Sequence, residues 1–134
     1  MKKNLQYTII LIMGVLLFSP ALNAGVDYSM ERVIEYKKKY GAYNPFFRTN
    51  KSGDVVSECW NAPHRMWKVK EALKFAKLLV PEKLKSKNPV LITSDKVKKI
   101  YKYSDGTRII FKMLGGKCTL VGVYNFSYKG PACR

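Results

Sequence analysis

The dipeptide Asp105-Gly106 is the feature that most limits how this chain can fold, because it separates two runs that favour β-structure. A type I′ turn needs positive φ at both central positions, which Asp-Gly accommodates, so the dipeptide predicts a tight β-hairpin. Further β-rich runs flank the hairpin, and Gly115 and Gly116 mark another turn. The β-rich runs cover residues 90–93, 96–103, 108–113 and 118–128. Consecutive strands joined by short turns predict an antiparallel meander in the C-terminal third of the chain.

Two helices are predicted before the meander. The first covers residues 29–40 and stops at Gly41, a residue type favoured just after the last helical turn. The second begins near Asn61 and Pro63 and stops before Pro81. Its apolar stripe consists of Met66, Val69, Leu73, Ala76 and Val80. Spacings of three and four residues align these side chains on one helix face, which we expect to dock on the sheet.

These elements predict an α+β fold, with two N-terminal helices packed on a C-terminal antiparallel β-meander of three to four strands. Residues 42–54 are rich in turn-forming residues and are predicted to be a loop between the helices. Tyr43, Phe46 and Phe47 lie in this loop. We expect these rings to fold back onto the core, with an exposed recognition patch as the alternative.

An export leader is predicted at the N-terminus. Two lysines precede an apolar run at residues 7–18, and small residues follow up to Ala24. This order is that of a removable signal peptide, and the run is shorter than the about 20 residues that a transmembrane helix needs. We therefore expect a signal peptide at residues 1–24 and a single small domain at residues 25–134. The mature protein is expected to be periplasmic or secreted, without a stable membrane span.

A large excess of positive charge is the strongest functional signal. The chain has 25 Lys and Arg residues and 9 Asp and Glu residues, so loss of the two leader lysines leaves a net charge of +14 (25 − 2 − 9). A magnitude of about 2 to 8 already keeps a small domain in solution. Excess charge of one sign attracts polyanions and destabilises the folded state by self-repulsion. We therefore expect an acidic protein or an anionic envelope polymer as the partner, with nucleic acid as a further candidate.

Three cysteines remain in the mature chain, Cys59, Cys118 and Cys133. In an oxidising compartment, two of them are expected to pair and one to be left over. One straight strand over 119–128 would carry the chain about 33 Å from Cys118, and the five residues after it can return about 17 Å at most. A Cys118–Cys133 bond therefore requires a reversal near Asn125. This comparison favours a disulfide between Cys59 and either of the two C-terminal cysteines.

A two-residue turn at Asp105-Gly106 would also fix which residues oppose each other, namely those whose numbers add up to 211. Five residues would then share one face of the hairpin, namely Lys99, Tyr101, Tyr103, Arg108 and Lys112. Cations interleaved with aromatic rings suit an anionic ligand, because the charges attract it and the rings offer stacking surfaces. We expect this face to be the binding site. The opposite face, with Phe111, is expected to receive the second helix.

The segment SECWNAPHRMWK holds Cys59 and the only histidine, His64, near the predicted start of a helix. A helix N-terminus lowers the pKa of a thiol, so a catalytic Cys–His pair is chemically feasible there. Papain-like enzymes, however, have their histidine more than about 100 residues downstream of the cysteine, and an oxidising compartment favours a disulfide. One histidine without a closely spaced cysteine pair also gives no tetrahedral metal set. We expect no catalytic residue, no metal and no cofactor.

Helices followed by a basic meander resemble, in layout, the barnase-like and RelE-like toxin nucleases over roughly residues 60–128. The resemblance implies RNA cleavage. The candidate residues are Tyr101, Tyr103, Arg108 and Lys112, with Glu58 and His64. The leader argues against the RelE type of action, which requires ribosomes.

The sequence as a whole therefore predicts a secreted or periplasmic, non-catalytic basic binding protein. It would be an immunity or inhibitor protein, or an accessory subunit of an envelope machine. A small secreted cationic ribonuclease-like toxin is the alternative.

Overall fold

The computed structural model describes the backbone of residues 20–133 and the side chains of residues 30–133. Contacts divide the chain into two units, Met1–Ile34 and Glu35–Arg134, and the whole sheet lies in the second unit. Helix α2 covers Pro20–Tyr40 and runs from the first unit into the second. The second unit holds every candidate functional residue.

Helix α2 ends where the sequence predicts. Gly41 has φ of 74°, and its N–H donates to the carbonyl oxygen of Lys37 over 3.1 Å. Glycine reaches this left-handed conformation without a steric penalty, so it closes the helix. Residues 1–19 of the predicted signal peptide lie outside the described residues. The predicted cleavage site after Ala24 falls within α2 of the uncleaved chain, and cleavage there stays a prediction.

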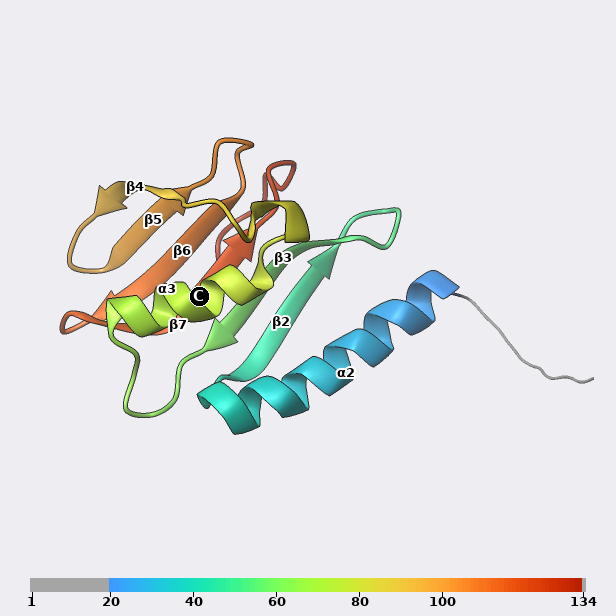
Figure 1. Ribbon diagram of the computed structural model, residues 1–134, viewed down its shortest axis with the longest axis horizontal. Helices are drawn as coiled ribbons and strands as arrows, with labels where there is room; N and C mark the ends of the chain where they lie inside the picture. Colours follow the sequence, from blue (N-terminus) through green and yellow to red (C-terminus); the bar gives the residue numbers. More distant parts are fainter. Residues whose placement is uncertain (1–19, 134) are drawn as a thin grey trace, which may run out of the picture. The chain divides into compact units, whose positions relative to one another are not determined.

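One six-stranded antiparallel sheet forms the body of the second unit, in the order β2-β3-β7-β6-β5-β4 (Figure 1). Its strands are β2 (Tyr43–Thr49), β3 (Val55–Asn61), β4 (Val90–Ser94), β5 (Lys98–Lys102), β6 (Arg108–Leu114) and β7 (Lys117–Tyr124). Helix α3 (Val69–Leu79) and the short 3-10 helix η1 (Glu82–Leu84) separate β3 from β4. The α+β class and the C-terminal meander are confirmed. The predicted order is wrong, because strands β2 and β3 lie between the helices and extend the sheet beyond four strands.

The predicted loop after α2 is in fact the β2–β3 hairpin. Asn44 has a positive φ of 49° and Pro45 follows it, and the pairing with β3 is irregular between Tyr43 and Phe46. An edge strand tolerates such residues, because one side of its backbone needs no partner in the sheet. At the hairpin turn, the Asn50 side chain accepts hydrogen bonds from the backbone N–H groups of Ser52 and Asp54. The turn-forming residues of this segment therefore led to the wrong prediction of a loop in place of strand β2.

Helix α3 begins at Val69, later than the predicted start near Asn61 and Pro63. The reason is that the chain continues to pair with β7 after β3 ends. The N–H of Ala62 donates to Thr119, and Trp67 forms an isolated bridge with Cys118. The predicted apolar stripe is also only partly correct. The buried residues of α3 are Ala72, Phe75 and Ala76.

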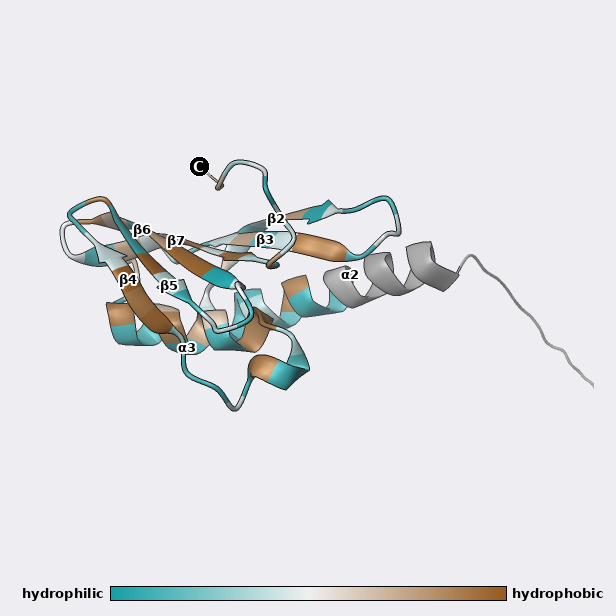
Figure 2. Cartoon of the chain, turned by 90° about the horizontal axis from the view of Figure 1, so that it is seen from above, coloured by the Kyte–Doolittle hydropathy of each residue, from teal (hydrophilic) through white to brown (hydrophobic). Residues whose placement is uncertain are grey.

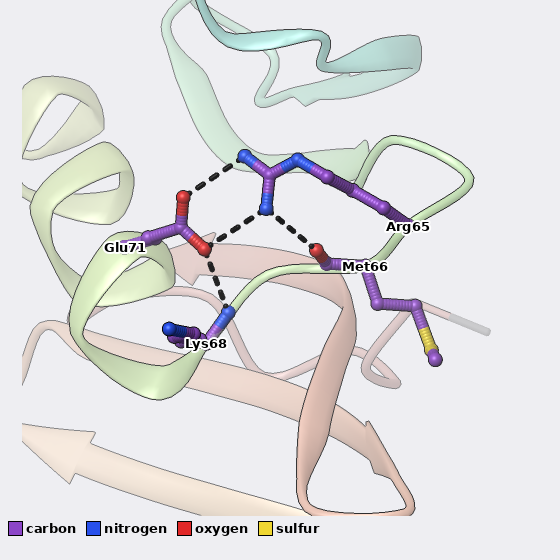
Figure 3. Close-up of polar contacts among 4 residues, drawn as sticks. All are labelled: Arg65, Met66, Lys68 and Glu71. Atoms are coloured by element: carbon purple, nitrogen blue, oxygen red, sulfur yellow. Dashed lines mark hydrogen bonds and ion pairs between the residues drawn. The ribbon is translucent and has the colours of Figure 1, made fainter.

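Glu71 caps the start of α3 (Figure 3). Its carboxylate accepts two hydrogen bonds from the Arg65 guanidinium, over 3.1 and 2.9 Å, and one from the backbone N–H of Lys68 over 3.0 Å. The hydrogen bonds from Arg65 are the largest cause of a Glu71 pKa of about 2. Glu71 is therefore ionised at neutral pH, which suits the positive end of a helix dipole.

Aromatic rings fill the core between α3 and the sheet. Trp60 on β3 lies 5.7 Å from Phe75 of α3, 5.5 Å from Tyr36 and 6.3 Å from Phe47, measured between ring centres. Phe75 in turn contacts Trp67 at 4.8 Å. We call the side of the sheet that carries Trp60 the helix-side face. Phe47 meets the expectation that loop aromatics return to the core, whereas Tyr43 and Phe46 are exposed.

The register of the β5–β6 hairpin differs by one residue from the prediction. Tyr103 donates its N–H to Thr107 over 2.8 Å, which closes a three-residue loop over 104–106. Only Gly106 in this loop has positive φ, at 98°. A type I′ turn would need two such residues, so the predicted turn does not form. Tyr101 consequently pairs with Ile109 and not with Ile110. Because successive residues of a strand point to opposite faces, a shift of one residue changes which residues of β5 share a face with those of β6.

Candidate anion-binding face

The C-terminal segment 125–133 crosses the sheet on the side away from α3 (Figure 2). We call this side the tail-side face. A disulfide joins Cys59 on β3 to Cys133, with the Cα atoms 6.3 Å apart. The predicted pairing of Cys59 with a C-terminal cysteine is thus confirmed. The chain does reverse near Asn125, but Cys118 pairs with Met113 on the helix-side face and so points away from Cys133.

Tyr124 anchors the tail to the sheet. Its hydroxyl accepts a hydrogen bond from the Cys133 N–H over 2.8 Å and lies 3.6 Å from the Cys59 sulfur. The ring folds back over Gly122, where an added Cβ would approach the ring carbon Cζ within 2.7 Å. Any residue larger than glycine at 122 would displace this ring. Tyr128 stacks on Tyr124 with ring centres 5.7 Å apart, so the tail packs as a layer on the sheet.

Neither the disulfide-bonded Cys59 nor the free Cys118 provides a nucleophile near His64. Cys59 is in the disulfide, and the buried Cys118 thiol donates to the Leu120 carbonyl over 3.3 Å. Burial raises the pKa of Cys118 to about 12, so the thiol keeps its proton at neutral pH. His64 is exposed in the loop before α3. A thiolate–histidine pair therefore does not form in this state.

The five residues predicted to bind a partner do not share a face. Tyr101 and Tyr103 are buried on the helix-side face, where Tyr101 packs 5.4 Å from Phe111 between ring centres. Lys99 belongs to the same face and donates from Nζ to Ser94 over 2.6 Å. The two remaining members, Arg108 and Lys112, lie on the tail-side face. The shifted hairpin register is the cause of this separation.

The structure instead brings together a basic quartet on the tail-side face, namely Lys98, Lys102, Arg108 and Lys112. The three lysines are exposed and Arg108 is half-buried. Lys98 lies directly opposite Lys112, and Lys102 lies directly opposite Arg108. The half-buried pair Ile100 and Ile110 lies between them, so two cation pairs flank an apolar strip. These pairs could have been read from the sequence if a hairpin loop of three residues had been assumed instead of two.

No member of the basic quartet forms an ion pair within the part of the chain that the structure describes. Acidic side chains are engaged elsewhere. Glu71 pairs with Arg65, and Asp105 pairs with Lys83 at 3.7 Å. Like charges directly opposite each other in a sheet are destabilising, so the two pairs raise the free energy of the folded chain. A bound anion would remove this repulsion.

Arg108 links the basic quartet to the tail. Its guanidinium lies 5.5 Å from the centre of the Tyr124 ring, and Nη2 donates to the Tyr128 carbonyl over 3.1 Å. These contacts fix the side chain, whereas the three lysines have no side-chain hydrogen bond within the described residues. Arg108 therefore has a structural role as well as a charge, and the lysines are the better residues for testing binding.

The residues implied by the nuclease layout are also dispersed. Glu58 is buried on the helix-side face and accepts a hydrogen bond from the Trp60 indole over 2.8 Å. Arg108 and Lys112 lie on the opposite face of the sheet. Among the described residues, no three His, Cys, Asp or Glu side chains gather closely enough to hold a metal ion. Glu58 is therefore separated by the sheet from Arg108 and Lys112.

Comparison with protein-family models, curated proteins and solved structures finds no match for this chain. No helix within the described residues is both long and apolar enough to cross a membrane. The disulfide is compatible with a periplasmic or secreted location, since such bonds persist in oxidising compartments.

Proposed function

We propose that this chain is an exported, non-catalytic basic binding protein that recognises an acidic protein or anionic envelope polymer through the basic quartet. It would act as an immunity or inhibitor protein or as an accessory subunit of an envelope machine. The observation that supports this proposal is the pair of directly opposed cations, Lys98–Lys112 and Lys102–Arg108, without ion-pair partners in the described chain. Such repulsion is relieved when an anion binds.

The apolar strip between the cation pairs favours an acidic protein over nucleic acid. Ile100 and Ile110 offer aliphatic surface, which suits the side chains of a protein partner. Single-stranded nucleic acid is usually bound with aromatic rings on which its bases stack. Tyr101 and Tyr103, the rings expected for that role, are 8 % and 2 % exposed on the other face. A protein with carboxylates around a small apolar patch is the best match.

Replacing Lys98, Lys102 and Lys112 together by Gln is expected to weaken binding to poly-L-glutamate by about tenfold. Exposed ion pairs contribute about 0.5 kcal/mol each, so three of them account for about 1.5 kcal/mol. Binding of the unchanged protein should also weaken with added salt, because exposed charges are screened over about 8 Å at physiological ionic strength. Fluorescence anisotropy with labelled poly-L-glutamate at several salt concentrations measures both effects.

The matched control replaces three exposed lysines away from the tail-side face, Lys70, Lys74 and Lys87, by Gln. Its net charge changes by the same amount, so it isolates position from total charge. We expect its affinity to stay within about twofold of the unchanged protein. Equal weakening by both triple variants would show that binding follows net charge alone, and the proposed face would be rejected.

The ribonuclease-like toxin remains the second candidate because its layout predicts cleavage of RNA. We expect single-stranded RNA to stay intact after incubation with the purified, disulfide-bonded protein, since the implied residues lie on opposite faces of the sheet. Gel electrophoresis of a labelled oligonucleotide measures this. Cleavage that disappears in Lys112→Gln, with the fold retained, would instead place the nuclease first.

A further inference from the structure

A cavity of about 250 Å³ lies between the tail and the edge of the sheet, separate from the basic quartet. Its walls come from β2, β3, β7 and the last residues of the tail. The residues that matter here are Asn44, Phe46, Arg48, Asn61 and the Cys59–Cys133 disulfide. The disulfide fixes one wall relative to the others. The disulfide therefore holds the tail wall of the cavity to β3.

Arg48 brings an uncompensated positive charge to this cavity. Its guanidinium lies 5.2 Å from the centre of the Phe46 ring and 5.7 Å from that of Tyr128, and Nη1 donates to the Tyr128 hydroxyl. The buried Nε has no hydrogen-bond partner, and no acidic side chain pairs with Arg48 in the described chain. A guanidinium has five N–H donors, and the Tyr128 hydroxyl is the acceptor found for them among the described residues, so donors on the terminal nitrogens remain for a ligand.

Two amide side chains complete the polar lining. Asn44 and Asn61 both border the cavity, and no hydrogen bond to another side chain occupies either of them within residues 30–133. Asn44 holds a left-handed backbone conformation, with φ of 49°. This conformation is uncommon in residues other than glycine, because it costs free energy. Residues that adopt it are often found at functional sites. Phe46, 52 % exposed, adds an aromatic surface beside these groups.

We propose that this cavity binds a small carboxylate, with Arg48 as the anion-binding residue and Asn44 and Asn61 as hydrogen-bonding residues. A guanidinium pairs with a carboxylate through two parallel N–H···O bonds, which gives both charge and geometry. The cavity volume of about 250 Å³ admits one residue or one sugar ring and excludes a folded segment. The carboxylate belongs to the C-terminus of a peptide or to an acidic sugar.

The test is an NMR titration of the disulfide-bonded protein with N-acetylglycine and, separately, with glucuronate. We expect saturable shifts of the backbone amides of Phe46, Arg48 and Cys133 with at least one of the two compounds. N-acetylglycinamide, which lacks the charge, should bind at least about tenfold more weakly. Preference for N-acetylglycine assigns the site to peptide C-termini, and preference for glucuronate assigns it to acidic sugars. No saturable shift with either compound overturns the proposal.

Variants locate the site. Arg48→Gln should abolish the shifts. Arg65→Gln removes the same charge at an exposed position that does not line the cavity, and should bind as the unchanged protein does. Asn44→Gly removes the amide but keeps a residue suited to positive φ, and should weaken binding by about threefold or more even if Arg48→Gln fails to fold. Unchanged binding by both Asn44→Gly and Arg48→Gln contradicts the assignment, and so does an equal loss of binding in Arg65→Gln.

Discussion

Replacing Cys59 and Cys133 together by Ala is expected to lower the free energy of unfolding by about 4 kcal/mol. The disulfide joins residues 74 positions apart, and a crosslink that closes a loop of this length restricts the unfolded chain by about that amount. A small domain has a total stability of about 5 to 15 kcal/mol, so the variant should be close to unfolding. Urea denaturation at equilibrium measures the difference.

Cys118→Ala is the control for the disulfide. It removes the free thiol and keeps the Cys59–Cys133 bond, so its stability should still fall when a reductant is added, as that of the unchanged protein does. The double variant should show no response to reductant. A double variant as stable as the oxidised protein would mean that the tail contributes nothing to stability through the disulfide.

Phe111→Ala is expected to cost about 3 to 5 kcal/mol of stability, the usual cost of truncating a buried aromatic residue to Ala. Phe111 has no solvent exposure and packs against Tyr101 on the helix-side face. The neighbouring Lys112 is exposed on the opposite face, so Lys112→Ala should change stability by no more than about 0.5 kcal/mol. Thermal or urea unfolding measures the stability of both variants, and so compares a buried residue with its exposed neighbour in the chain.

Tyr101→Ala separates the two hairpin registers, because Phe111 is in the core in both. In the observed register Tyr101 is buried beside Phe111, so its truncation should cost a similar amount. In the register expected for a two-residue turn, Tyr101 would lie on the solvent face and its truncation would be nearly neutral. A neutral Tyr101→Ala would therefore restore the grouping of Tyr101 and Tyr103 with Arg108 and Lys112.

The meander was predictable because its signals are local. Alternating apolar residues and short glycine turns identified β4, β5, β6 and β7 close to their observed bounds. Strands β2 and β3 were missed because Asn44 and Pro45 interrupt the first of them. Strand β3 pairs with β7, more than 50 residues downstream, and this partner is not indicated by a local pattern.

The predicted register of the β5–β6 hairpin was wrong by one residue, so the five residues predicted to bind a partner do not share a face. The sequence indicated that cations line one face of the β5–β6 hairpin, and this is observed. Assuming a two-residue turn at Asp105-Gly106 placed Tyr101 and Tyr103 among those cations instead of Lys98 and Lys102. Because successive strand residues point to opposite faces, this single error moved both rings from the core to the predicted binding surface.

The sequence by itself determined the α+β class, the meander, the end of α2 and the excess of positive charge, since each follows from residue type or from neighbours in the chain. Only the tertiary structure decided the strand order, the basic quartet and the cavity beside Arg48, which depend on contacts between distant segments. The disulfide shows the division most clearly. The chain-length argument left both Cys118 and Cys133 as possible partners for Cys59. In the structure Cys59 bonds to Cys133, because the sheet separates these two cysteines from Cys118.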